Sequence, residues 1–139
     1  MQKQKGFTII ELIVVIAIIA VLATIVMINV TSYIAKGKDA SIQGNLANLM
    51  TNSASYFDST SNYTNFCAAT TGAASYLTAI DSTEGGTGKT DCNVATSAWA
   101  ACAQLVNTDA YFCVDSTGAK KSIATRTTCV AAWAATVCP

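Results

Sequence analysis

Six cysteines are the residues of this 139-residue chain that are best suited to covalent chemistry. They lie at positions 67, 92, 102, 113, 129 and 138, and no two of them have the Cys-x2–4-Cys spacing of zinc sites. The chain contains no histidine, which removes the commonest general base and metal ligand and excludes Ser-His and Cys-His nucleophiles. An even number of cysteines is typical of the disulfide framework of a small exported domain.

The pairing of these cysteines is not fixed by the sequence, because six cysteines allow 15 connectivities. The disulfides that we expect are Cys67–Cys92, Cys102–Cys129 and Cys113–Cys138. The first would close the connection between a helix and a sheet, and the third would tie the C-terminal tail to a strand. A Cys129–Cys138 bond is the main alternative for the tail.

The segment Gly88-Lys89-Thr90 resembles the end of a phosphate-binding loop, whose pattern is G-x-x-x-x-G-K-[ST]. The first glycine of that pattern would fall at position 83, where the chain has threonine. No apolar strand precedes the segment, and no long helix follows it before Cys92. We therefore interpret it as a solvated loop, and the sequence predicts a protein that is not an enzyme and has no metal or other cofactor.

Glu11 is the one charged residue in an otherwise apolar run over residues 9–30, which only Thr24 and Asn29 also interrupt. As a helix this run would extend roughly 33 Å, enough to cross a hydrocarbon core of about 30 Å. A charge in such a segment costs about 2.5–3.5 kcal/mol on insertion scales and usually has a functional partner. Lys3 and Lys5 precede the run, which predicts that the rest of the chain lies outside the cytoplasm.

These N-terminal residues resemble the prepilin motif of type IV pilins and pseudopilins. The motif residues are Lys5-Gly6-Phe7-Thr8-Ile9-Ile10-Glu11-Leu12, and the apolar run continues behind them. The resemblance implies that a prepilin peptidase cuts between Gly6 and Phe7, that the Phe7 nitrogen is then methylated, and that Glu11 guides assembly. One departure is that residues 7–35 lack the helix-kinking proline that the family often has.

The resemblance also implies a function, which is that of a structural subunit of a type IV pilus or related filament. The subunit would wait as a single-pass protein of the cytoplasmic membrane, with its head outside, and then enter an extracellular pilus or envelope-spanning filament. Its partners would be further copies of itself, the prepilin peptidase and the assembly platform with its ATPase. The sequence does not distinguish a major pilin, a minor pilin, a pseudopilin of secretion and a competence pilin. Contact with nucleic acid is expected only for the last, and adhesion or motility only for some pili.

Two other interpretations of the N-terminus stay open. One is a secretory signal peptide that is cut after residues 21–23, and the other is a plain single-pass anchor. Either would make the protein a disulfide-rich binding module. The mature N-terminus separates these possibilities, because it would be Phe7 for a pilin and about Thr24 after an ordinary signal peptide.

Two hypotheses also remain for the role of Glu11. After cleavage it would lie four residues from the new amine of Phe7, about one helical turn away. It would either satisfy the amine of its own chain or pair with the amine of the preceding subunit.

The helix is expected to continue over residues 31–58 with a change of character. Its apolar residues fall within about a third of a helical wheel, which predicts one buried stripe. The stripe comprises Ile42, Leu46, Leu49, Met50, Tyr56 and Phe57. We thus divide the chain into a leader (1–6), a transmembrane or filament-core helix (7–30), an amphipathic continuation (31–58) and a globular, disulfide-rich head (59–139).

The head is expected to contain a short helix at 72–80, a loop over 81–91 and then strands. Strand-like patterns cover residues 97–106, 110–115 and 121–126, and turns separate them at 107–109 and 116–118. The tail at 127–139 would fold back on the sheet. A long helix followed by such a meander predicts an α+β fold with a small antiparallel sheet packed on the helical stripe.

Overall fold

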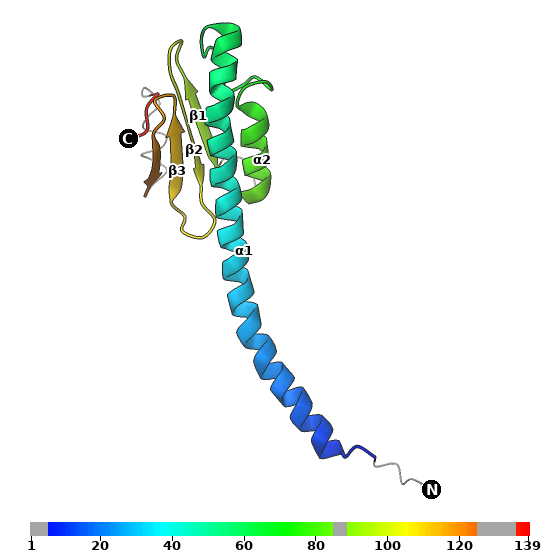
Figure 1. Ribbon diagram of the computed structural model, residues 1–139. Helices are drawn as coiled ribbons and strands as arrows, with labels where there is room; N and C mark the ends of the chain where they lie inside the picture. Colours follow the sequence, from blue (N-terminus) through cyan, green and yellow to red (C-terminus); the bar gives the residue numbers. More distant parts are fainter. Residues whose placement is uncertain (1–5, 85–88, 125–135) are drawn as a thin grey trace. The chain divides into compact units, whose positions relative to one another are not determined.

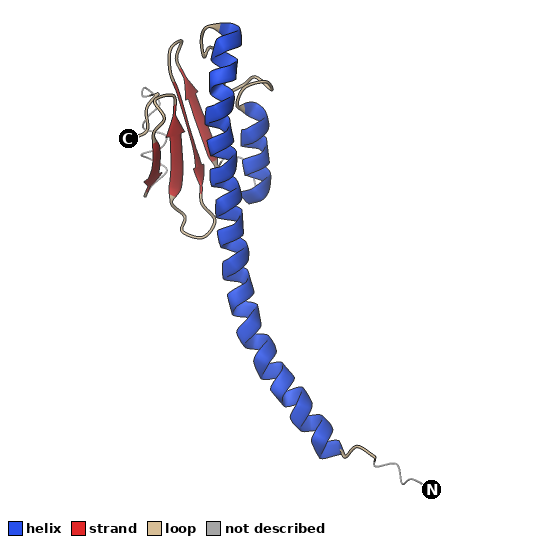
Figure 2. Cartoon of the chain, viewed as in Figure 1, coloured by secondary structure: helices blue, strands red, loops and turns tan. Residues whose placement is uncertain are grey.

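The computed structural model describes residues 6–84, 89–124 and 136–139, which form two helices and four strands (Figures 1 and 2). The chain divides into two compact units, Met1–Ile34 and Ala35–Pro139. Helix α1 (Ile9–Thr60) supplies residues to both units. No proline interrupts it, and its two glycines, Gly37 and Gly44, have open space where a side chain would stand.

The first unit contains the apolar part of α1, where no residue is buried. Every large apolar side chain from Ile9 to Ile34 is at least 45% exposed. By length and composition this helix is able to cross a membrane, as predicted. Its surface is apolar all round, so it has no polar face that water would solvate.

The second unit begins with the buried stripe of α1, which the sequence largely predicted. The residues that α1 buries are Ile42, Leu46, Leu49, Ser53 and Tyr56. Met50 is partly buried against the same core. Placing Phe57 in the stripe was wrong, since its side chain is 41% exposed and lies 4.9 Å from the Tyr63 ring, centroid to centroid. Ser53 tolerates burial because its hydroxyl donates to the Met50 carbonyl oxygen at 2.7 Å.

Helix α2 (Ala74–Glu84) confirms the predicted short helix and extends it. Ile80 is fully buried, and Tyr76 and Leu77 pack against the same core. The prediction of a loop from residue 81 was wrong for 81–84, which are helical. Polar residues occupy this last turn, and their hydroxyl groups, such as that of Ser82, are satisfied by carbonyl oxygens one turn back.

The sheet consists of β1 (Thr90–Val94), β2 (Trp99–Gln104), β3 (Tyr111–Asp115) and β4 (Lys120–Ile123). The strands are antiparallel neighbours in the order β1-β2-β3-β4, which makes the predicted meander one strand longer. Strand β1 was missed. It is an edge strand whose Asp91 and Asn93 are poor strand formers, so the sequence resembles a loop.

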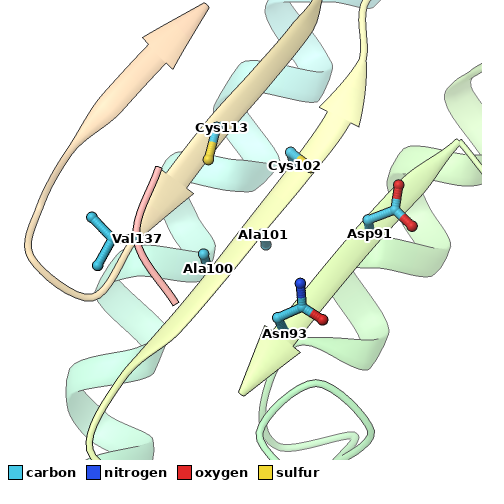
Figure 3. A pocket seen from close by; sticks show the side chains of 7 residues that line it. All are labelled: Asp91, Asn93, Ala100, Ala101, Cys102, Cys113 and Val137. Carbon is cyan, nitrogen blue, oxygen red and sulfur yellow. The ribbon is translucent and has the colours of Figure 1, made fainter. Parts of the chain in front are cut away.

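Both faces of the sheet are covered. Trp99, Ala101, Ala103 and Val114 join the core that includes the α1 stripe and Ile80 of α2. The alternate residues form a second cluster on the other face with Cys138 of the tail. These residues are Cys102, Tyr111, Cys113 and Ile123. Figure 3 shows this outer face, where Val137 of the tail lies against β2 and β3.

The structure contains the disulfides Cys67–Cys92 and Cys113–Cys138, which are two of the three expected pairs. Cys102 is also disulfide-bonded. Its expected partner, Cys129, lies outside the described residues, and so do residues 127–135 of the predicted tail. The fold is therefore α+β, with a long N-terminal helix and a small antiparallel sheet that disulfides staple.

Glu84, the last residue of α2, carries a buried carboxylate. It is 9% exposed, and neither of its carboxylate oxygens has a partner among the described residues. Burial raises the pKa of Glu84 to about 7, Lys89 opposes this shift, and Asp81 adds to it. A negative charge at the C-terminal end of a helix is also unfavourable.

We expect Glu84→Gln to stabilise the protein at high pH and not at low pH. The folded-state pKa is raised, so ionising Glu84 costs stability that is fully present below pH 4.5 and is lost as the pH rises through about 7. At pH 8 the free energy of unfolding should rise by on the order of 1–3 kcal/mol. Chemical unfolding of the full chain in detergent measures it, and an equal gain at pH 4 and pH 8 would contradict this account.

Candidate processing and assembly site

The peptide bond between Gly6 and Phe7 lies outside helix α1, which begins at Ile9. Gly6, Phe7 and Thr8 have no regular secondary structure, and the Phe7 side chain is 79% exposed. No atom lies within 4 Å of the place where a Gly6 side chain would stand. The chain itself therefore does not require glycine at this position, and the bond is accessible to a protease.

Thr8 and Glu11 cap the N-terminus of α1. Glu11 Oε2 accepts hydrogen bonds from the Thr8 backbone N–H and from the Thr8 hydroxyl, both at 2.8 Å. The Glu11 backbone N–H donates in return to Thr8 Oγ1 at 3.3 Å. This is a capping box, in which a threonine and a glutamate three residues later satisfy each other's backbone donors. The T-x-x-E spacing of Thr8 and Glu11 is a sequence signal for a helix start at this position.

The charge of Glu11 is not neutralised by this cap. The two donors from Thr8 reach only Oε2, and Glu11 forms no ion pair within residues 6–84, 89–124 and 136–139. Oε1 therefore remains able to accept a hydrogen bond from a cation. The structure leaves open both predicted roles of Glu11, because in this precursor the Phe7 nitrogen is part of a peptide bond.

Thr24, Asn29 and Thr31 each donate a hydrogen bond to a carbonyl oxygen of their own helix. Thr24 Oγ1 donates to the Val21 carbonyl oxygen at 2.7 Å, and Asn29 Nδ2 donates to that of Ile25 at 3.0 Å. Thr31 makes the same kind of bond to Ile28. These bonds lower the cost of surrounding the three side chains with lipid or other apolar helices.

The alternative signal-peptide site lies inside α1. Residues 21–23 are helical, and the Val21 carbonyl oxygen already accepts the Thr24 hydroxyl. A cut there would require this part of the helix to unwind, whereas Gly6 and Phe7 are already outside it.

The phosphate-loop resemblance at residues 88–90 has no structural support. Thr90 begins strand β1 rather than a helix, and its hydroxyl donates to Asp81 Oδ1 at 3.1 Å. Gly88 lies outside the described residues. Within the described part of the chain, no group of three or more cysteine and acidic side chains is placed to hold a metal ion.

Comparison with known proteins identifies a processing motif at the same N-terminal residues. Residues 1–27 match the family model of the prokaryotic N-terminal methylation motif. No match was found among curated proteins or among solved structures. Proteins with this motif are generally structural rather than enzymatic. The chain thus carries the signal motif of type IV pilins and pseudopilins ahead of a pilin-like α+β fold, as expected of a membrane-anchored precursor that a prepilin peptidase processes.

Proposed function

We propose that the protein is a structural subunit of a type IV pilus or a related filament, and that packing of its N-terminal helices builds the polymer. The observation that carries this proposal is the surface of residues 9–34. That surface is almost entirely apolar and exposed, its Thr24, Asn29 and Thr31 side chains donate to their own helix, and it carries one charge that the Thr8 cap does not neutralise, at Glu11. A helix of this kind is suited to an apolar environment that supplies a cation beside Glu11.

Two apolar environments are available to this helix in turn. Before assembly it spans the cytoplasmic membrane, with residues 35–139 on the outer side because Lys3 and Lys5 stay in the cytoplasm. After the leader (residues 1–6) is removed, it leaves the lipid and packs among the helices of other copies. Ala17, Ala20 and Ala23 recur at every third position and let neighbouring backbones approach closely.

Glu11 sets the register of this packing. A buried charge is costly alone, while a matched pair offsets much of that cost. The cleaved chain offers the cation, namely the methylated amine of Phe7, and the amine of the preceding subunit would reach Glu11 when a new subunit docks. The capping box is compatible with this pairing, because it occupies Oε2 and leaves Oε1.

The remaining parts of the proposal come from the family resemblance. The head (residues 59–139) coats the filament and makes its outer surface. The prepilin peptidase, an assembly platform and its ATPase act on the subunit before and during polymerisation. Filaments of this kind serve in adhesion, motility, secretion or DNA uptake. Purifying surface fibres and identifying their main subunit would show which kind of filament this protein builds.

The first prediction concerns processing. We expect the mature protein to lack residues 1–6 and to carry one methyl group on the Phe7 nitrogen, which the intact mass of the native protein measures. Gly6→Leu should abolish the cut, because the peptidase rather than the chain requires glycine there. Gly37→Leu is the control, since that glycine also has open space but lies inside α1. A mature chain that begins near Thr24 would instead support the signal-peptide alternative.

The second prediction concerns assembly. We expect Glu11→Val to insert in the membrane and to be cut after Gly6, yet to lose most filament formation when it is the only subunit supplied. Its helix would bring an amine into the apolar core without the matching carboxylate. Thr24→Val is the matched control, because it removes a polar group that already bonds to its own helix, and it should assemble normally.

Sheared filament yield per cell, normalised to subunit in the membrane, measures the difference. If Glu11→Val polymerised at the wild-type level, Glu11 would be only a helix cap.

A further inference from the structure

Three cysteines meet on the outer face of the sheet. Cys102, Cys113 and Cys138 are each at most 4% exposed and belong to one buried cluster. Cys113 is bonded to Cys138, with Cα atoms 5.8 Å apart. Cys102 lies directly opposite Cys113 in the pairing of β2 with β3, as Figure 3 shows.

Cys102 is itself disulfide-bonded in the folded protein, but in a reduced chain that is still folding this arrangement offers Cys113 a second possible partner. Residues directly opposite on antiparallel strands have Cα atoms about 4.5–5.5 Å apart, which lies within the range of disulfides, roughly 4.4–6.8 Å. Fewer residues separate Cys113 from Cys102 than from Cys138. The β2–β3 hairpin also forms from local contacts, and local contacts form early in folding. A folding chain therefore has a ready alternative to the Cys113–Cys138 bond.

Asp115 is the residue that connects Cys138 to the strand that carries Cys113. It lies two positions after Cys113 on β3, so both side chains point to the same face, and it is 1% exposed. Its Oδ1 accepts the Thr117 N–H at 2.8 Å, the Thr117 hydroxyl at 2.6 Å and the Ala119 N–H at 3.2 Å. Its Oδ2 accepts the backbone N–H of Cys138 itself, at 2.8 Å.

The two oxygens of Asp115 therefore have different tasks. Oδ1 accepts from the turn between β3 and β4. Its donors are at most four residues away in the chain, so these hydrogen bonds form together with the hairpin. Oδ2 receives a donor from 23 residues away. Burial raises the pKa of Asp115, but the hydrogen bonds from Thr117, Cys138 and Ala119 outweigh burial and leave the pKa below its ordinary value. The carboxylate is thus an ionised acceptor near neutral pH.

We propose that Asp115 selects the disulfide partner of Cys113, because its carboxylate docks the Cys138 amide and places the Cys138 thiol beside Cys113 in preference to Cys102. The turn fixes the carboxylate first, the tail then binds to Oδ2, and the sulfur atoms meet. With glutathione disulfide as oxidant, the Cys113 thiolate attacks one glutathione sulfur and releases a glutathione thiolate. The Cys138 thiolate then attacks the Cys113 sulfur of this mixed disulfide and releases the second glutathione thiolate. Two electrons thus pass from the two cysteines to glutathione.

Oxidative refolding of the full chain in detergent micelles tests this proposal. The reduced, denatured chain is diluted into a glutathione redox buffer, thiols are blocked, and non-reducing peptide mapping measures each pair. For the wild-type chain we expect Cys113 to be bonded mainly to Cys138. For Asp115→Ala we expect that share to fall at least fivefold, with Cys102 as the new main partner of Cys113. Asp115→Asn retains one carbonyl oxygen and should fall in between.

Two controls separate partner selection from a general loss of structure. Asp109→Asn removes the charge of an exposed carboxylate that accepts the Gln104 amide at 3.1 Å, keeps a residue type that tolerates the positive φ of this position, and should leave the pairing unchanged. Cys92 packs against the core cluster rather than in the cluster of Cys113 and Cys138, so the Cys67–Cys92 bond should form in Asp115→Ala as in the wild-type chain. The proposal is overturned if Asp115→Ala keeps the wild-type share of Cys113–Cys138. It is equally overturned if Cys67–Cys92 is lost to the same extent, or if the new main partner of Cys113 is not Cys102.

Discussion

The apolar surface of residues 9–34 must be kept out of water, and this constraint governs the rest of the molecule. Burying apolar surface is favourable by roughly 25 cal/mol per Å², and in this helix every large apolar side chain is substantially exposed. The apolar window of this helix is not buried within the described chain. The second unit has a core of its own. Lipid or other apolar helices could cover the apolar surface of residues 9–34.

The second unit is stabilised by a small core and by disulfide bonds. The stripe of α1 supplies one side of that core, and alanines on β2, such as Ala101 and Ala103, let the layers pack closely around Trp99. A sheet of four short strands buries little surface, so a domain of this size gains much from staples. Cys67–Cys92 ties the segment after α1 to the edge strand β1, and Cys113–Cys138 ties the tail to β3.

The sequence predicted the parts of this fold that depend on periodicity and on local chemistry. Ile42, Leu46 and Leu49 recur with the spacing of a helix face, so their burial was readable, and so was the turn at Gly118, whose φ is 91°. Strand β1 and the last turn of α2 were missed because polar residues occupy them, and hydrogen bonds to neighbours outweigh their weak propensities. Phe57 follows the helical spacing of the stripe, yet the Tyr63 ring contacts it outside the core.

Polar contacts between residues far apart in the chain could not be predicted from the sequence. Asp39 lies on α1 ahead of the stripe, and its Oδ1 accepts the backbone N–H of Val106 at 2.6 Å, so it holds the β2–β3 connection to the helix. Asp115 belongs to a strand-like run, and nothing in that run indicates that its carboxylate binds Cys138. Glu11 is the opposite case. Its cap with Thr8 is local and readable, while the partner that would neutralise its charge is not within the described chain. The three carboxylates therefore differ in where their donors come from. Asp39 and Asp115 accept from distant parts of the chain, whereas Glu11 accepts, among the described residues, from its neighbour Thr8.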